Sequence, residues 1–240
     1  MIRPSDGFVH HSNFDRARFG QAGRTTVKPT TSYLLHRICS IGPFAGYPKF
    51  QSLLDRLTGG EDQNWSRVVM RRECRQFIEA LQPGRLKALE ISGSFFGEVG
   101  FREYKSVQHP EYDVCAEPLP DTFDLIIAEQ VFEHLLWPYR AGRNVYQMLN
   151  TGGHFLISTP FLVKVHKIPD DCTRWTETGL KYFLAECGFP LEGIRTGSWG
   201  NTACVKAHLR EQEPVRYRRR IHSLHNEPDY PYHVWALAQK

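Results

Sequence analysis

The chain has 240 residues, of which 41% are hydrophobic and 23% charged. These values are ordinary for a soluble globular protein and allow one large α/β domain. The net charge of +4 does not by itself indicate a nucleic-acid-binding protein. No apolar run approaches the ~20 residues that a membrane helix needs, and residues 1–20 lack the apolar core of a signal peptide. We therefore expect a cytoplasmic protein that binds neither nucleic acid nor membrane.

The six cysteines are scattered without a Cys-x-x-Cys pair. A reduced protein without structural zinc is the simplest interpretation. Positive charge is concentrated in "RYRRR" at 216–220. Such a run is interpreted as a solvated surface segment, with anion binding as the alternative.

The N-terminal third differs from the rest of the chain. Residues 1–31 are polar, and residues 32–58 carry short apolar stripes at helical spacing, broken by "GPFAGYP" and followed by "GGEDQN". The segment 65–81 places its apolar residues near one helical face, and Pro83-Gly84 ends it. We expect a flexible N-terminus and helical cap over residues 1–82, which would act as a lid, and a main domain over residues 83–240.

Strand and helix patterns alternate from residue 86 onwards. "FDLIIAEQ" is a continuous apolar run typical of a strand buried on both faces, and helix patterns cover 138–150, 176–189 and 201–212. The alternation predicts a Rossmann-like α/β fold, with a doubly wound, mostly parallel sheet and an antiparallel C-terminal edge strand. In such sheets ligands bind outside the carboxyl ends of the strands, where we expect Glu90, Glu129 and Pro160.

Four segments, in this order, carry a family resemblance: "LEISGSFFGEVG" (89–100), "EPLPDTFDLIIAEQVFEHL" (117–135), "LNTGGHFLISTPF" (149–161) and "HKIPDDCTRWTETGLKYFLAECGF" (166–189). Together they resemble class I S-adenosylmethionine-dependent methyltransferases, in a type 11-like branch with a His-x-x-Pro-x-Asp-x-x-Arg-Trp-Thr segment. The resemblance covers about residues 86–240. It implies S-adenosyl-L-methionine as cofactor and methyl transfer to an oxygen, nitrogen or carbon of a small molecule, in secondary-metabolite or sugar biosynthesis.

The resemblance implies a set of cofactor-binding residues. The first loop contributes Glu90, Ser92, Gly93 and Ser94, with serines where the family has glycines. Gln108 stands where the family presents an acid to the ribose, and Glu111 is a possible substitute.

Later residues complete this set. Asp113 corresponds to the adenine-facing acid and Val114 to the residue that packs on the ring, although Asp113 is also interpretable as an ordinary turn acid. Glu129 and Gln130 end a predicted strand and would border the methionine portion.

The catalytic candidates are two histidines at the same end of the sheet. His134 or His166 would act as the base if the acceptor must lose a proton. The alternative for His134 is a helix residue hydrogen-bonded to backbone.

Three further residues are substrate-binding candidates. Arg174 would either pair with Asp170 or hold an anionic substrate. Trp175 would either lie in the core or stack on the substrate.

Two other functions stay open. A pseudo-methyltransferase would keep the fold as a binding module, which the serines of the first loop favour. A metal-assisted RNA or quinone methyltransferase is the other, because a Glu-His pair and a later histidine resemble the metal-binding set of those enzymes. Here Gln130 replaces the first acid and is a poorer ligand for a hard cation. We therefore expect no metal.

Overall fold

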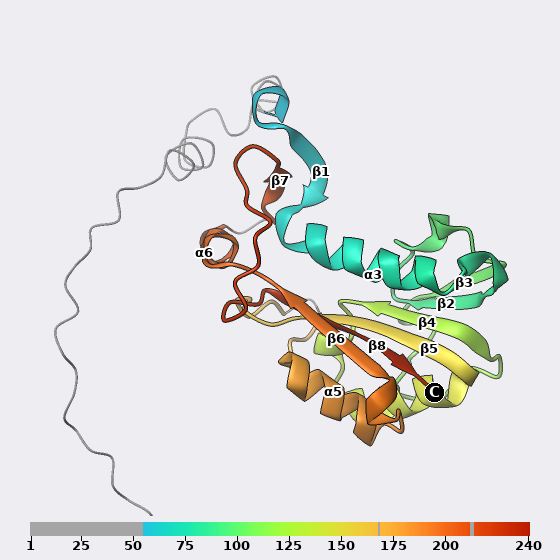
Figure 1. The fold of residues 1–240 in the computed structure, drawn as a ribbon. Helices are drawn as coiled ribbons and strands as arrows, with labels where there is room; N and C mark the ends of the chain where they lie inside the picture. The colour runs from blue at the N-terminus through green and yellow to red at the C-terminus, as the bar shows by residue number, and fades with distance from the viewer. Residues whose placement is uncertain (1–54, 168, 212–213) are drawn as a thin grey trace, which may run out of the picture.

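A six-stranded sheet, in the order β3-β2-β4-β5-β8-β6, forms the centre of the molecule (Figure 1). The computed structural model describes residues 55–167, 169–211 and 214–240. Strands β2 to β5 are parallel, and β8 is antiparallel to both of its neighbours. The strands are β2 (Lys87–Ile91), β3 (Glu103–Val107), β4 (Phe123–Glu129), β5 (Leu149–Pro160), β6 (Ile194–Trp199) and β8 (His233–Gln239). The predicted doubly wound, mostly parallel sheet is confirmed, and its antiparallel pair β6–β8 lies at one edge with β6 outermost.

Helices cover both faces of the sheet. In Figure 1, α3 (Val68–Ala80) lies above the strands and α5 (Glu177–Glu186) below them. Helix α6 (Thr202–Arg210) packs on the α3 side and α4 (Pro138–Met148) on the α5 side. Strand β4 supplies both cores by alternation, since Leu125 and Ile127 face α3 while Ile126 faces α4 and α5.

Local sequence signals explain the ends of the helices. The Thr176 hydroxyl accepts a hydrogen bond from the Gly179 amide at the start of α5, and Gly188 follows its end with a φ of 116°. The Asn201 side chain caps α6 in the same way by accepting from the Cys204 amide. Pro138 occupies the first turn of α4, where its missing N–H costs no hydrogen bond.

The connection between β2 and β3 contains no crossover α-helix. It has only the short 3-10 turn η3 (Gly97–Val99), as the ten residues available there predict. Phe96, which is 1% exposed, fills the space beneath α3 instead. Helix α3 is therefore a layer of the sheet domain.

A second, two-stranded sheet pairs β1 (Gly60–Asn64) with β7 (Arg216–Arg218) in antiparallel orientation. The segment "GGEDQN", expected as a break between helices, thus contains a strand. Arg216 and Arg218 pair with Asp55 at 3.3 and 3.5 Å, so part of the basic run has a structural role. Residues 1–54 of the expected N-terminal segment lie outside the described residues. Within the described residues, no helix has the length and apolarity that crossing a membrane requires.

Candidate functional site

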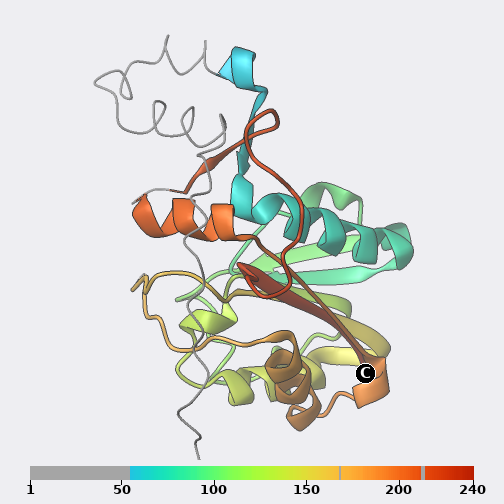
Figure 2. The same cartoon turned by 60° about the vertical axis from the view of Figure 1, so that its left-hand side comes forward.

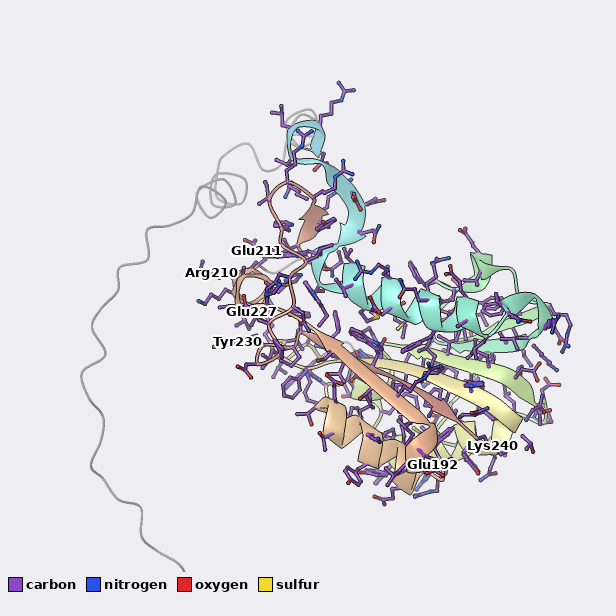
Figure 3. All side chains as sticks on the ribbon, in the orientation of Figure 1. Glu192, Arg210, Glu211, Glu227, Tyr230 and Lys240 are labelled. Atoms are coloured by element: carbon purple, nitrogen blue, oxygen red, sulfur yellow. The ribbon has the colours of Figure 1, made fainter. Side chains whose placement is uncertain are left out.

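The carboxyl ends of β2, β4 and β5 meet at one edge of the sheet, together with the first residue of β8. His233 lies opposite both Pro160 of β5 and Trp199 of β6. Glu211 and Tyr230 lie at this end of the molecule, and Lys240 lies at the other (Figure 3). Strand order reverses between β2 and β4, which makes their carboxyl ends the expected ligand crevice.

Glu90 anchors the loop after β2. Its side chain is buried: Oε1 accepts a hydrogen bond from the Phe95 amide at 2.9 Å, and Oε2 accepts from the Phe96 amide at 3.0 Å and from the Tyr104 hydroxyl at 2.7 Å. Burial raises the pKa of Glu90, opposed by these hydrogen bonds. Because its carboxylate already accepts three hydrogen bonds, Glu90 shapes the predicted cofactor loop from beneath.

The loop itself adopts glycine-type geometry despite its serines. Ser92 has a φ of 55°, in the left-handed region that favours glycine, and its amide donates to the Val107 carbonyl at 2.7 Å. A Cβ on Gly93 would lie 2.9 Å from Oε1 of Glu90, so a larger residue there would displace this carboxylate. Ser92 and Ser94 are exposed, as a cofactor loop requires.

The other predicted cofactor residues follow β3. Gln108 and Asp113 are exposed, while Val114 is 3% exposed and belongs to the core beside α4. Asp113 Oδ1 accepts a hydrogen bond from the Cys115 amide at 2.8 Å, which fixes the orientation of the carboxylate. Asp113 therefore stabilises the local turn, as one of the two interpretations expected. Its carboxylate is also exposed, which is compatible with a cofactor contact.

Two arginines of the α3 side, which sequence analysis missed, bind Glu129 at the end of β4. Oε1 of Glu129 accepts from Nη1 of Arg67 at 3.1 Å and from Nε and Nη2 of Arg71 at 2.9 and 2.7 Å. Oε2 is buried and has no hydrogen-bond partner among the described residues. The Arg71 guanidinium also lies 3.6 Å from the ring centroid of Phe95. The i, i+4 spacing of the arginines was the only sequence signal that they share a helical face.

This donor set fits the head of an amino acid. In a ligand with an ammonium and a carboxylate, the ammonium would suit the unpartnered oxygen of Glu129, which is buried until the side chain turns, and the carboxylate would suit the two guanidinium groups. Gln130, the next residue, has a φ of 57°, and its side-chain amide donates to the Ser158 hydroxyl at 3.3 Å. The predicted methionine-binding end of the crevice thus contains suitable groups.

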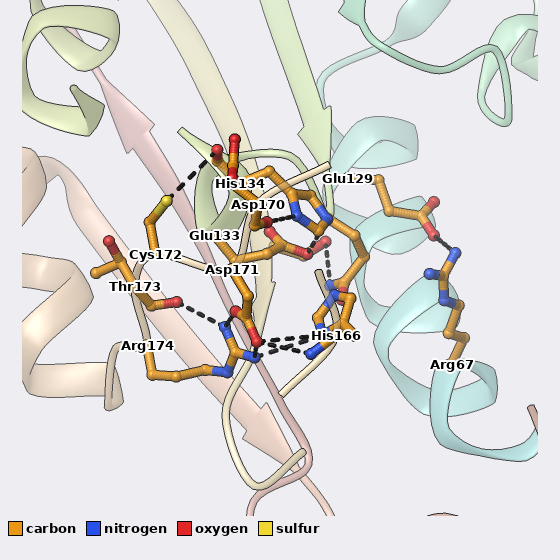
Figure 4. Close-up of polar contacts among 12 residues, drawn as sticks. Arg67, Glu129, Glu133, His134, His166, Asp170, Asp171, Cys172, Thr173 and Arg174 are labelled. Carbon is orange, nitrogen blue, oxygen red and sulfur yellow. Dashed lines mark hydrogen bonds and ion pairs between the residues drawn. The ribbon is translucent and has the colours of Figure 1, made fainter. Parts of the chain in front are cut away.

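Both predicted catalytic histidines lie beside Glu133 (Figure 4). One ligand atom from each of Glu133, His134 and His166 lies within 4.8 Å of the other two. Glu133, whose side chain is 1% exposed, has its pKa raised to about 8 by burial. His134 Nδ1 contacts the Asp170 carbonyl, so the expected backbone hydrogen bond exists, although His134 lies in a 3-10 turn, η4 (Phe132–His134).

Arg174 binds Asp171 instead of Asp170, so the predicted pairing is wrong. Its Nη2 donates to Asp171 Oδ2 at 2.7 Å, and Nη1 binds the other oxygen. Asp171 Oδ2 also accepts from the His166 amide at 2.9 Å. Trp175 is 7% exposed and packs on Phe183 with ring centroids 5.1 Å apart, so it has the core role of the two proposed.

A cavity of about 210 Å³ adjoins this cluster. It lies between β5, α6 and the Asn64–Arg67 turn, and Figure 2 shows α6 beside the start of α3. Its polar lining includes Arg67, Gln130, Lys164, His166, His208 and His233. His208 and His233 lie far from His166 in sequence, and no local motif pointed to them.

His233, in the lining of this cavity, makes the free energy of unfolding of the protein depend on pH. Its pKa is held well below 6.5, mainly by burial, and its Nε2 lies 3.2 Å from the Ser66 hydroxyl. Below pH ~6.5 the unfolded chain takes up a proton that the folded His233 does not bind, so the free energy of unfolding falls by at most ~1.4 kcal/mol per pH unit on its account. We expect His233→Gln to remove this contribution.

The measurement is urea unfolding at pH 7.5 and 5.5. Between these values, the variant should lose ~1 kcal/mol less stability than the wild type. His225→Gln, at an exposed position, is the control and should follow the wild type. Equal losses for His233→Gln and the wild type would contradict the prediction.

A comparison with known proteins identifies a protein family that matches this chain. A family model described as a methyltransferase domain matches residues 43–189, more than half of the chain. No curated protein matches the sequence.

Solved structures with a similar fold include two S-adenosylmethionine-dependent methyltransferases. The one from Archaeoglobus fulgidus is 13% identical over 80% of this chain and 100% of its own, with a TM-score of 0.48. The one from Mesorhizobium loti is 16% identical over 69% of this chain and 96% of its own, with a TM-score of 0.44.

Proposed function

Because the chain belongs to the family of methyltransferase domains, we propose that it transfers a methyl group from S-adenosylmethionine to a polar small molecule. S-adenosylmethionine, the cofactor of this family, supplies an electrophilic methyl group. The observation that carries the proposal is the pair of groups that follow β2 and β4: the left-handed Ser92 loop, and the Glu129–arginine set, whose Arg71 contacts Phe95 of that loop. The finer assignments, to the type 11-like branch and to sugar or secondary-metabolite biosynthesis, rest on the segments 117–135 and 166–189.

In this proposal the crevice holds the cofactor by its two ends. Glu129, Arg67 and Arg71 bind the amino acid head, and Asp113 binds the nucleoside. Ser92 and Ser94 let the loop backbone approach the ligand, because both side chains are small. The protein's main contribution is alignment of the acceptor atom with the methyl group.

The acceptor would occupy the cavity of about 210 Å³. Gln130 and Arg67 connect the two sites, since both line this cavity and lie at or next to the Glu129 set. His166 is the member of the histidine cluster that reaches the cavity. Burial lowers its pKa below the usual 6.5, which leaves a neutral imidazole available to act on an acceptor hydroxyl.

The positions of two phenylalanines support an active enzyme over a pseudo-enzyme. A side chain that filled the cofactor crevice would indicate lost binding. Phe96 instead lies beneath α3 in the core, and Phe95 contacts the Arg71 guanidinium while staying 40% exposed.

Calorimetric titration with S-adenosylhomocysteine tests the proposal. We expect binding by the wild type, and a ~3- to 10-fold weaker affinity for Asp113→Asn because a charge-assisted hydrogen bond to the ligand becomes a neutral one. Asp121→Asn is the matched control, because Asp121 precedes β4 at the opposite edge of the sheet and pairs with exposed Lys105. Absence of any heat of binding at millimolar ligand would overturn the proposal.

Acceptors are then screened by mass. A gain of one methyl group on a polar small molecule, dependent on S-adenosylmethionine, is the expected result.

A further inference from the structure

We propose that Glu133, His134 and His166 form a binding site for a divalent first-row transition-metal ion. Nε2 of His134 lies 3.6 Å from Oε1 of Glu133, and all three ligand atoms lie within 4.8 Å of one another. Ligand atoms that share an ion at ~2.0–2.2 Å lie roughly 3–3.5 Å apart. Small side-chain movements would therefore close the site around an ion.

An unpartnered oxygen points independently to a ligand. Glu133 Oε2 is buried and accepts no hydrogen bond from the described residues. The whole side chain is 1% exposed. A buried carboxylate oxygen without a partner is costly, and a bound cation would compensate it.

Surrounding contacts orient both imidazoles for metal binding. The Asp170 carbonyl can only accept a hydrogen bond, so Nδ1 of His134 carries the proton and Nε2 presents its lone pair beside Glu133. Nδ1 of His166 lies 3.4 Å from Nη2 of Arg174 and 3.7 Å from Oδ2 of Asp171, so this ion pair holds the imidazole ring in place. A contact such as that of His134 with the Asp170 carbonyl fixes the tautomer and the ring of a metal-binding histidine.

The backbone also holds the two segments of the site together. The amides of Cys172 and Thr173 both donate to the Glu133 carbonyl, at 2.8 and 3.2 Å. The loop that follows β5 is thereby tied to the turn that follows β4. These long-range contacts hold Glu133, His134 and His166 together. The site therefore does not need an acid at position 130, where the side-chain amide of Gln130 binds Ser158.

The ligand set indicates the class of ion. Two imidazoles and one carboxylate are ligands that suit Zn²⁺, Fe²⁺, Mn²⁺ or Co²⁺. They suit Mg²⁺ and Ca²⁺ less well, because these ions prefer oxygen ligands alone. Three protein ligands leave at least one position open. Since His166 also lines the cavity, an acceptor oxygen could take that position. With the ion bound, the ion and not the His166 imidazole would then activate the acceptor hydroxyl; this consequence, unlike the metal site, rests on the proposed function.

Cobalt titration of the full chain, followed by visible absorption, tests the site. We expect Co²⁺ to produce visible bands, Zn²⁺ to displace it, and one equivalent of zinc to remain after dialysis. His166→Gln and Glu133→Gln should each weaken Co²⁺ binding about 100-fold, because each removes one of three ligands. Circular dichroism and thermal unfolding establish that the variants fold.

His225→Gln is the matched control, since His225 is exposed and outside the cluster. It should bind Co²⁺ like the wild type. Equal Co²⁺ affinity in the wild type and His166→Gln would place the ion elsewhere, for instance at histidines of residues 1–54, and would overturn the proposal. So would a wild type without bands at millimolar Co²⁺. Retained binding of S-adenosylhomocysteine in that case would separate this failure from a failure of the proposed function.

Discussion

Glu90→Ala is expected to lower the free energy of unfolding by ~3 kcal/mol and to abolish measurable binding of S-adenosylhomocysteine. The substitution leaves the amides of Phe95 and Phe96 and the hydroxyl of Tyr104 without their acceptor. Each lost partner costs ~1–3 kcal/mol when the remaining group stays buried, but partial solvent access and relaxation of the loop reduce the sum. The loop loses the contacts that shape it, so the cofactor should lose its binding surface as well.

Urea unfolding and calorimetry measure the two effects. Glu98→Ala is the control, because Glu98 lies in the same connection with an exposed side chain. It should change stability by less than ~0.5 kcal/mol. If Glu90→Ala bound S-adenosylhomocysteine as tightly as the wild type, the loop would not depend on this carboxylate and the account of its geometry would be wrong.

Gly200→Ala is expected to destabilise the protein by ~3 kcal/mol or more. A Cβ at this position would lie 2.1 Å from the Tyr230 carbonyl oxygen, 2.3 Å from the Tyr232 amide nitrogen and 2.8 Å from the carbonyl carbon of Pro231. All three are backbone atoms, so relief requires a shift of the chain before β8. Overpacking that forces such shifts costs typically 1–3 kcal/mol and sometimes more.

The control is Gly84→Ala, where the added Cβ has open space and its nearest neighbour is 3.9 Å away. We expect that variant to stay within ~0.5 kcal/mol of the wild type. Thermal and urea unfolding compare the two. A Gly200→Ala protein as stable as Gly84→Ala would show that the backbone there yields easily.

The sequence predicted most of the sheet because its signals are local. The apolar run of β4 and the caps of α5 show which segments are buried and where helices end. The two-stranded sheet of β1 and β7 was missed for two reasons. The segment "GGEDQN" has the composition of a turn, and its partner strand lies about 150 residues later in the chain, so the pairing leaves no local pattern. The expected methyltransferase family was confirmed by the family model that matches residues 43–189.

The site was harder to predict than the fold. Asp170 and Asp171 are adjacent acids, and only the path of the loop decides that Arg174 reaches the second. Ser92 adopts a backbone conformation that favours glycine, which composition could not reveal. The arginines on Glu129 and the histidines of the cavity come from distant segments, so their proximity is a property of the tertiary structure.

The position of β8 has a consequence for the order of folding. Among the strands of the described residues, β6 pairs only with β8, so residues 194–199 have none of these partners until residues 233–239 have left the ribosome. Strands β2, β3, β4 and β5 can pair earlier, and with them the two sides of the cofactor crevice. A nascent chain that ends before residue 233 would therefore assemble the half that contains the proposed cofactor site, while the half around the proposed acceptor cavity forms last.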